Sequence, residues 1–496
     1  MIEVPELLAL DDPARATLDG LEPGERMLAL GRLSREALLH PAAELELGLG
    51  GDRVRARSAL GGGPAARVEL ALPEPPVPPA PSALRRSWRA LNDRFPVLAD
   101  EIAQRRLSAM MRAAAPAFRA RVATERLDPV APGAGRPAVI VGMYWLEVGG
   151  AERWALASAR IVAEAGLVPI LVTDQRSAHP LAAQAAALGA LHLPLDDLAS
   201  ADADRALDAL LGAFDVRGVL IHHARAVYRW LPRLAALRPD VPVIDSLHLV
   251  EWEDGGFPLL SAQHDAQITA HHVISPPLAE QLAELSGMAR DRIHVATLLG
   301  VAGEVEAHRR RPFADTQTLV FVGRLVKQKR PELFIELVRR LRRSGRMPRL
   351  RAVLHGSGPA EPRIRSLVAR YGLGDVIELR GSDVPVDHTF AEADCLIVTS
   401  QNEGLALTAM EGHAAGAVVI SADVGAQRTL VSDALLVPRA PRRLLRDAEV
   451  AVLKLSADPA AVEAARSDQE RKLEAFRDLD DATTWLRGIV SRWRIR

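Results

Sequence analysis

The sequence is poor in the residues that build disulfides, zinc sites and membrane spans. Only one of its 496 residues is cysteine, which excludes a disulfide framework and a cysteine-based zinc site. Cys395 lies in an apolar run, so we expect a buried strand residue rather than a nucleophile. No run of about 18 apolar residues could span a bilayer, and the N-terminus lacks the features of a signal peptide. These absences predict a cytoplasmic protein whose membrane contact is confined to its surface.

Aromatic residues, net charge and lysine are also scarce. Aromatic side chains make up 4% of the chain and the net charge is −1, so the composition argues against nucleic acid as a partner. The chain has 62 basic residues, and all are arginine except Lys327, Lys329, Lys454 and Lys472. Because Lys327 and Lys329 lie so close together, their retention favours a constraint on side-chain size at one of them.

The first 135 residues differ from the rest of the chain in composition and in the pattern of predicted helices and strands. After a helical start, alternating segments between 43 and 72 predict a small β unit. A proline stretch at 73–81 predicts a stiff spacer, and a basic, alanine-rich arm at 84–127 predicts one or two helices. We expect residues 1–135 to form an N-terminal extension.

From residue 136 onwards, buried strands alternate with helices, and the pattern restarts at 319. This alternation is typical of parallel sheets with right-handed crossovers. The predicted fold class is therefore α/β, with two doubly wound Rossmann-like domains facing a cleft. We expect an acceptor-side domain at 136–310, a donor domain at 311–475, and a C-terminal helix at 476–496 that packs back on the first domain.

Ligands of such folds bind beyond the carboxyl ends of the strands, where this sequence has glycine-rich loops. Gly149-Gly150 opens a helix in the first unit, and its backbone N–H groups are suited to a phosphate. A tight turn is an equal alternative. In the second unit Gly323-Arg324 leaves a strand end, and Lys329 adds a charge five residues later. The loop of Gly356 and Gly358 follows the next strand and, taken alone, is simply a turn.

The segment from Thr399 to Glu411 carries the most information. Glu403 lies in a loop after a buried strand, and Glu411 is predicted about two turns into the following helix. The helix N-terminus between them can face a diphosphate while the carboxylates bind hydroxyl groups. In isolation, two surface glutamates on a charged helix would be the simpler interpretation.

Taken together, residues 137–440 resemble the retaining GT-B glycosyltransferases of family 4, most clearly over 319–438. The resemblance implies that Glu403 binds the transferred sugar and Glu411 the ribose of a nucleotide-diphosphate sugar, that Arg324 and Lys329 hold the diphosphate, and that His248 lies near the donor sugar. It also implies retention of anomeric configuration and a role in cell-surface glycan or glycolipid synthesis. The implied catalytic residues are Glu403, Arg324, Lys329 and His248. The implied donor-binding residues are Gly149, Gly150, Gly323, Gly356, Gly358, Arg380, Gly404, Leu405, Ala406, Leu407 and Glu411.

No cofactor or metal is expected besides the nucleotide sugar. Arg324, Lys329 and two helix N-termini can offset the charge of a leaving diphosphate. The pair Asp202 and Asp204 sits in helical sequence and is interpreted as a solvated face. The adjacent pairs His222-His223 and His271-His272 are rejected as chelates, because neighbours along a strand point to opposite faces. An acidic, aromatic loop at 251–256 suits sugar hydroxyls or, equally, solvent.

Two alternatives remain for the function. One is another nucleotide-sugar enzyme of this fold, such as an epimerase or a phosphorylase. The other is a catalytically silent binding or scaffold subunit.

The basic arm at 84–127 supports a further hypothesis about partners. Its ten arginines exceed its acidic residues by six, and they accompany an apolar stripe. The arm is expected either to dock on an anionic membrane with a lipid-linked acceptor, or on an acidic subunit, or to pack on the first Rossmann unit. The stripe consists of Trp88, Leu91, Phe95, Leu107, Met110, Met111 and Phe118.

Overall fold

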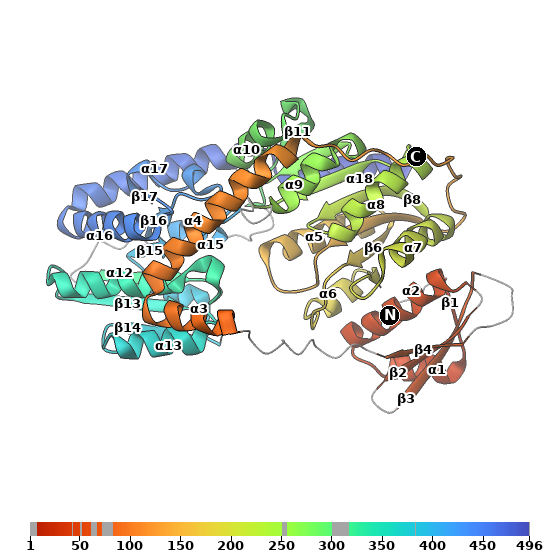
Figure 1. Cartoon of the computed structure of the whole chain (residues 1–496), viewed down its shortest axis with the longest axis horizontal. Coiled ribbons are helices and arrows are strands. Elements are labelled where there is room, and N and C mark those ends of the chain that lie inside the picture. The colour runs from red at the N-terminus through yellow and green to blue at the C-terminus, as the bar shows by residue number, and fades with distance from the viewer. Residues whose placement is uncertain are drawn as a thin grey trace.

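The structure, a computed structural model, describes residues 7–41, 43–49, 52–60, 67–71, 83–249, 255–299, 317–381 and 383–495. It contains two parallel sheets, each with helices on its faces, and a smaller mixed sheet (Figure 1). No helix in these ranges is long and apolar enough to cross a membrane. The predicted α/β class with two Rossmann-like domains is confirmed. The proline spacer and residues 251–254 of the acidic loop lie outside the described residues.

The first Rossmann-like domain is built on a seven-stranded sheet of order β11-β10-β9-β8-β5-β6-β7. Its strands are almost continuously apolar because helices cover both faces, as in β6, whose six residues are all buried. The strands are β5 (Pro137–Met143), β6 (Val168–Thr173), β7 (Leu191–Pro194), β8 (Asp215–His222), β9 (Val243–Leu247), β10 (Ala270–Val273) and β11 (Ile293–Val295). The helices are α5 (Gly150–Glu164), α6 (Ala182–Ala186), α7 (Ser200–Ala213), α8 (Arg225–Leu237), α9 (Gly256–Gln263) and α10 (Pro276–Ser286), with η2 (Asp265–Gln267) and η3 (Arg290–Arg292).

The second Rossmann-like domain has a six-stranded parallel sheet of order β14-β13-β12-β15-β16-β17 and its own hydrophobic core. Its strands are β12 (Gln317–Val322), β13 (Leu350–His355), β14 (Ile377–Arg380), β15 (Cys395–Val398), β16 (Val418–Ala422) and β17 (Leu436–Val437). Its helices are η4 (Lys327–Lys329), α12 (Pro331–Ser344), α13 (Glu361–Arg370), α14 (Val386–Glu392), α15 (Leu407–Ala414), η5 (Gln427–Thr429), η6 (Asp433–Leu435), α16 (Pro441–Ala457) and α17 (Pro459–Arg477). Cys395 is fully buried in β15, and burial raises the pKa of its thiol.

The N-terminal unit packs beside β7 of the first domain and shares one hydrophobic core with it. Its helix α2 contacts α6, α7 and β7. Two buried arginines of α2, Arg32 and Arg35, both donate to the carboxylate of Asp197 in the loop after β7. Arg35 Nη1 also donates to the carbonyl oxygen of Pro194 at the end of β7. The unit consists of β1 (Leu8–Leu10), α1 (Asp12–Asp19), α2 (Pro23–Leu39), β2 (Glu44–Leu49), β3 (Asp52–Ser58) and β4 (Arg67–Ala71).

The arm forms α3 (Ala83–Arg94), α4 (Pro96–Ala114) and η1 (Ala115–Arg119) and bridges the two Rossmann-like domains (Figure 1). Helix α4 packs on α12 and α16 of the second domain, and η1 packs on α9 and α10 of the first. The expectation that the stripe packs on the first domain holds for Met111 and Phe118, which belong to that domain's core cluster. It does not hold for Trp88 and Phe95, which are 37% and 49% exposed.

The chain ends by crossing back to the first domain. Helix α18 (Ala482–Ile495) packs on α5 and β8, and Trp493 fills the space that Gly218 leaves in β8. An isolated parallel bridge between Thr297 and Asp481 joins the end of the first domain to the start of this helix.

Candidate active site

The two glycine loops of the second domain interlock at the carboxyl ends of β12 and β13. Gly356 has φ +150°, and a β-carbon there would overlap the carbonyl oxygen of Gly323. Gly358 has the same φ, and its β-carbon would lie 2.7 Å from the carbonyl oxygen of Leu325. Hydrogen bonds from Gly323 N to His355 O (3.0 Å) and from Leu325 N to Ser357 O (2.8 Å) hold the loops together. Glycine is required here because two backbones meet.

Beside these loops, two of the predicted catalytic residues form an ion pair. Lys329 Nζ lies 2.6 Å from Oε1 of Glu403, whose side chain is 7% exposed. The segments that carry them are also joined by hydrogen bonds from Gln401 N to Gln328 O (2.7 Å) and from Gln328 Nε2 to Asn402 O (3.0 Å). Arg324, which follows β12 in the same loop, is exposed. The loop thus presents an exposed arginine in the same segment as the lysine of the ion pair.

A residue that the sequence did not single out, Arg330, ties these two segments together. It is 2% exposed and has φ +50° at the N-terminus of α12. Its guanidinium donates to the carbonyl oxygens of Thr399 (2.6 Å), Ser400 (2.8 Å) and Arg439 (2.9 Å). Thr399 Oγ1 in turn donates to Lys329 O, 2.8 Å away. No local pattern marks this role, since it depends on contacts between distant segments.

The second glutamate of the pair lies closer to the helix start than predicted. Helix α15 begins at Leu407, so Glu411 is its fifth residue, little more than one turn in, and the prediction of two turns is wrong. Residues Gly404, Leu405 and Ala406 form the loop before it. Burial raises the pKa of the Glu411 carboxyl, and the charge of Arg153 opposes that shift. Because Arg153 belongs to α5, this interaction crosses from one domain to the other.

The glycine pair of the first domain caps α5. Gly149 is the N-cap residue, and a β-carbon there would overlap the carboxylate of Glu152, whereas Gly150 faces open space. Glu152 accepts a hydrogen bond from Trp145 Nε1 at 3.0 Å. Burial raises the pKa of Glu152, and Arg324 of the second domain opposes the shift. This electrostatic interaction also joins the two domains, because Glu152 belongs to α5 and Arg324 follows β12.

His248 follows β9 and is buried within a hydrogen-bonded network. Its Nε2 lies 2.8 Å from Ser246 Oγ, which also contacts His272 Nδ1 (2.7 Å) and accepts from Trp154 Nε1 (2.9 Å). Burial holds the pKa of His248 well below its ordinary value, so the ring is neutral at pH 7. A β-carbon on Gly404 would overlap the carbonyl oxygen of His248, so the predicted donor loop and His248 are in contact.

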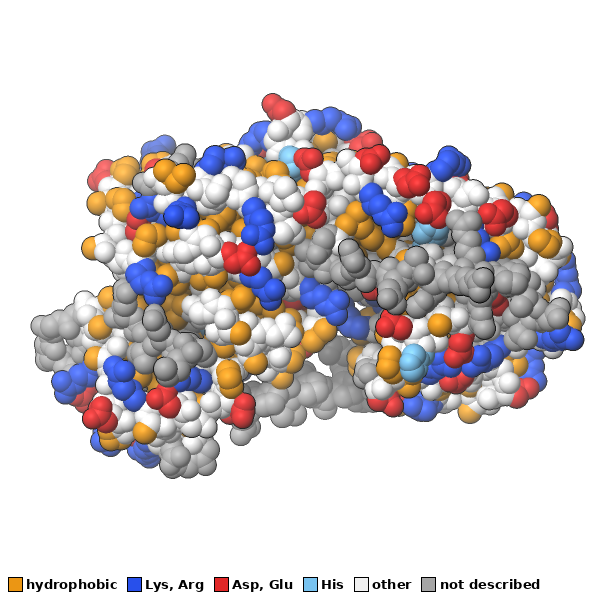
Figure 2. All heavy atoms as spheres, turned by 180° about the vertical axis from the view of Figure 1, so that it is seen from behind, with side chains coloured by type: hydrophobic (Ala, Val, Ile, Leu, Met, Phe, Trp, Pro, Cys, Tyr) orange, Lys and Arg blue, Asp and Glu red, His pale blue; other side chains and the backbone are white. Residues whose placement is uncertain are grey.

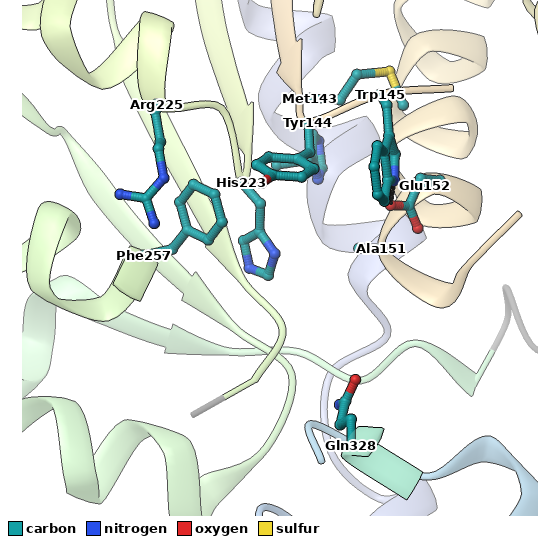
Figure 3. Close-up of a pocket in the computed structure, with 10 residues that line it drawn as sticks. Met143, Tyr144, Trp145, Ala151, Glu152, His223, Arg225, Phe257 and Gln328 are labelled. Carbon is teal, nitrogen blue, oxygen red and sulfur yellow. Dashed lines mark hydrogen bonds between the residues drawn. The ribbon is translucent and has the colours of Figure 1, made fainter. Parts of the chain in front are cut away.

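A cavity of about 280 Å³ opens next to this network (Figure 3). Aromatic faces and hydrogen-bonding groups share its walls, and Gln328 is the one lining residue from the second domain. Glu403, Arg324 and Lys329 are not in its lining, so the cavity marks the first-domain side of the site. Its walls are Met143, Tyr144, Trp145, Ala151, Glu152, His222, His223, Arg225, Phe257 and Gln328.

The prediction that His222 and His223 point to opposite faces is wrong. Both line the cavity, and their ring centroids lie 5.6 and 4.6 Å from that of His248. Strand alternation stops at this point because β8 ends at His222 and His223 has φ +62°. Phe257 stacks on the His223 ring at 4.5 Å, and burial lowers the pKa of His223 to about 4.

The side chain of Arg380 is already occupied within the protein. It binds Glu378 Oε1 (2.6 Å), Thr389 Oγ1 (3.0 Å) and both carboxylate oxygens of Glu392 (3.2 Å). Its backbone carbonyl accepts from Gly356 N at 2.9 Å. Arg380 therefore supports the glycine loop, and its guanidinium is not directed at a ligand.

The aspartate and histidine pairs that were considered as metal ligands have other partners within the protein. Asp202 and Asp204 lie in α7, and Asp202 pairs with Arg205. His271 lies 2.9 Å from Asp245 and 3.0 Å from Asp265 in an ion-pair network. Within the described residues, no group of three histidine, cysteine, aspartate or glutamate side chains is placed to hold a metal ion.

Parts of this chain are similar in sequence to known proteins. Residues 305–446 match the family model described as glycosyl transferases group 1. The chain is 26% identical over 336 residues to a D-inositol 3-phosphate glycosyltransferase of Streptosporangium roseum, covering 58% of this chain and 75% of that protein. It is 36% identical over 130 residues to the protein of the same name from Kineococcus radiotolerans, covering 24% and 30%. The chain thus spans three quarters of one such relative and under a third of the other.

Solved structures share the overall architecture. Anabaena Alr3699/HepE, in complex with UDP and glucose, aligns with a TM-score of 0.53 at 14% identity, covering 72% of this chain and 98% of that one. Sucrose-phosphate synthase from Thermosynechococcus elongatus aligns with a TM-score of 0.50 at 18% identity, covering 73% and 98%. The chain therefore has the GT-B fold, and the match of residues 305–446 supports glycosyl transfer as its reaction.

Proposed function

We propose that this chain is a retaining glycosyltransferase that moves a sugar from a nucleotide-diphosphate sugar to an acceptor without a metal ion. The observation that carries the proposal is the ion pair between Lys329 and Glu403 at the carboxyl ends of the second sheet, in contact with the His248 loop. It brings a cation for the diphosphate and a carboxylate for sugar hydroxyls to one place. The complexes of Anabaena HepE with UDP and glucose, on the same fold, favour this class of donor.

Each residue has a role that follows from its chemistry. Arg324 and Lys329 offset the negative charge that develops on the departing diphosphate. Glu403 accepts hydrogen bonds from the transferred sugar, and Glu411 from the ribose. The neutral ring of His248, whose Nδ1 has no partner among the described residues, is free to bond a sugar hydroxyl.

The reaction itself needs no protein nucleophile. The bond between the anomeric carbon and the diphosphate oxygen breaks, and the acceptor oxygen bonds to that carbon on the same face. The acceptor proton passes to the departing phosphate oxygen. The acceptor is placed in the cavity of the first domain, where Tyr144 and Trp145 offer ring faces and Glu152 a carboxylate. An acceptor in cell-surface glycan or glycolipid synthesis is the class that we propose.

The experiment that tests this proposal screens a panel of nucleotide sugars by thermal shift and then by transfer. A bound donor raises the melting temperature because it binds the native state. NMR of the product should show the anomeric configuration of the donor. Inversion would contradict the retaining mechanism, and donor conversion without any acceptor would favour an epimerase or a hydrolytic activity.

We also propose that the outer face of the arm contacts an anionic membrane. The structure changes which residues form the contact. Leu98 and Ile102 of α4 are 39% and 42% exposed, and Phe95 at its N-cap is 49% exposed, each about one helical turn from the next. Arg94, Arg105, Arg106 and Arg112 are exposed around them, while the arm's acids Asp93 and Asp100 pair with arginines of the second domain. Apolar side chains flanked by arginine suit the surface of an anionic bilayer.

Liposome flotation tests this contact on the full chain. The wild type should float with anionic vesicles, and a variant with Phe95, Leu98 and Ile102 changed to Ser should not. Val450→Ser, which removes an apolar side chain that is 62% exposed on α16, serves as the control. Equal flotation of all three proteins, or of none, would remove the membrane contact and leave an acidic protein partner.

A further inference from the structure

The carboxylate that pairs with the buried Arg330 comes from the arm. Oδ2 of Asp100, on α4, lies 3.2 Å from Nη1 of Arg330, and the two side chains are 13% and 2% exposed. They are separated by 230 positions in the chain. This contact joins the N-terminal extension to the loops of the predicted donor site. Neither Asp100 nor Arg330 has a role in the proposed transfer reaction.

This pair is needed because the guanidinium has little access to water. The three carbonyl oxygens that Arg330 binds provide dipoles but no negative charge. A buried charge that loses its partner is strongly unfavourable. Burial lowers the pKa of Arg330 and raises the pKa of Asp100, and each charge opposes the shift of the other. The negative charges of Glu332 and Glu101 also favour the charged form of Arg330, but more weakly than Asp100 does. The positive charge of Lys327 likewise favours the charged form of Asp100.

The position of Arg330 controls both halves of the lysine–glutamate pair. Lys329 is its neighbour in sequence, and the carbonyls of Thr399 and Ser400 begin the segment that ends at Glu403. A shift of the guanidinium would therefore displace the two segments relative to each other. The arm is held in place independently, because Ala99, Ala103 and Leu107 of α4 are buried against the second domain.

We propose that Asp100 is a positioning residue for the donor site: its carboxylate fixes Arg330, and Arg330 sets the relative placement of Lys329 and Glu403. The inference rests on the proposed function for its effect on catalysis. The structural part of the inference is that the arm orders the two loops, and this part can be tested without measuring any activity.

The test compares three full-length variants. Asp100→Asn removes the charge at nearly constant shape, and Asp100→Glu restores it. Glu101→Gln removes the neighbouring carboxylate, which lies 3.5 Å from the backbone N of Arg442 and acts on Arg330 only through a weaker field. Hydrogen exchange of the free proteins is measured for peptides covering 326–330 and 399–403. Melting temperature, and kcat and KM for the donor, are measured alongside.

In Asp100→Asn we expect faster exchange in both peptides and a fall in kcat/KM for the donor of about 10- to 100-fold, because small misplacements of binding groups cost this much. Asp100→Glu should recover most of the loss, and Glu101→Gln, whose field at Arg330 is weaker, should stay much closer to the wild type than Asp100→Asn. Should Asp100→Asn not fold, Asp100→Ser takes its place with the same readings.

Unchanged exchange in the variant would overturn the inference, whatever the activity. Faster exchange with an unchanged kcat/KM would overturn the positioning role. If the wild type itself transfers no sugar from any donor, the proposed function fails, while the exchange measurement still decides whether the arm orders the loops.

Discussion

Gly404 of the second domain packs directly against the carbonyl oxygen of His248 in the first, leaving no room for a β-carbon. The loop that follows Glu403 and the strand end that carries His248 are thereby in backbone contact. A donor bound to the loop would lie within reach of both domains. Small changes at this contact should therefore affect transfer more than stability.

The first prediction concerns this glycine. Gly404→Ala should lower kcat/KM by about 100-fold, because the added β-carbon would overlap the carbonyl oxygen of His248 and the two loops must separate to admit it. The melting temperature should change little, since each domain keeps its own core. Gly488→Ala is the control, because Gly488 lies in α18 with open space around it. Normal turnover by Gly404→Ala would show that the contact opens during the reaction.

The second prediction concerns the ion pair. Glu403→Ala and Lys329→Ala should each abolish transfer and leave the fold intact, because Glu403 lies in a loop and Lys329 in the short η4, both outside the hydrophobic cores. Loss of the partner leaves one charge poorly solvated, which costs about 1–3 kcal/mol of stability. Arg342→Ala removes an exposed ion pair with Asp375, 2.6 Å long, at the opposite end of α12 from Lys329, and should keep its activity. Unfolding of either site variant, checked by circular dichroism, would argue for a structural role instead.

The third prediction is that transfer survives chelation. The diphosphate is offered Arg324, Lys329 and the N-termini of α5 and α15, so EDTA should leave the rate within about twofold of its starting value. A complete loss of transfer that is restored by a divalent cation would refute the metal-independent mechanism.

The fourth prediction concerns stability in acid. Burial lowers the pKa of His223 and of His272 to about 4. The unfolded chain protonates these histidines near pH 6.5, so it binds more protons than the native state between pH 6.5 and 4, and stability falls as the pH is lowered through this window. Each of the two should contribute a loss of about 3 kcal/mol at pH 4.

Urea denaturation between pH 4 and 9 measures how the free energy of unfolding changes with pH. Asp174, whose pKa is raised to about 6, acts in the opposite sense below pH 6 and reduces the net effect. His271 has a pKa raised to about 9 by Asp245 and Asp265 against the desolvation that lowers it, so its stabilisation is lost as the pH rises from 6.5 through 9. Maximum stability is therefore expected near pH 6.5. A free energy of unfolding that rises towards pH 4 would contradict these assignments.

The sequence identified the parts of the site that depend on local signals. Carboxyl ends of parallel strands share one edge of a sheet, so the glycine loops after β12 and β13 could be expected to meet. Lys329 and Glu403 follow β12 and β15, which are neighbours in the sheet, so the same rule accounts for their proximity. The start of α15 was missed because Ala406 carries no capping side chain, and local sequence therefore did not mark Leu407 as its first residue.

Features that depend on distant contacts could not be predicted. The pairing of Asp100 with Arg330 joins segments that no periodicity connects. The amphipathic pattern of the arm indicated a helix with an apolar side, but not which domain would cover it, so the predicted stripe mixes buried Leu107 with exposed Phe95. Alternation along β8 misplaced His223 because one residue with positive φ reverses the direction of its side chain.

The route of the arm has a consequence for synthesis of the protein on the ribosome. Residues 83–119 emerge before either Rossmann-like domain, yet α4 is covered by α12 and α16. At about 5–20 residues per second, Asp100 waits roughly 10 to 50 s for Arg330 to be translated. During that interval the side of α4 that α12 and α16 cover has no partner surface, so nascent chains stalled before residue 330 should bind chaperones that recognise apolar helices.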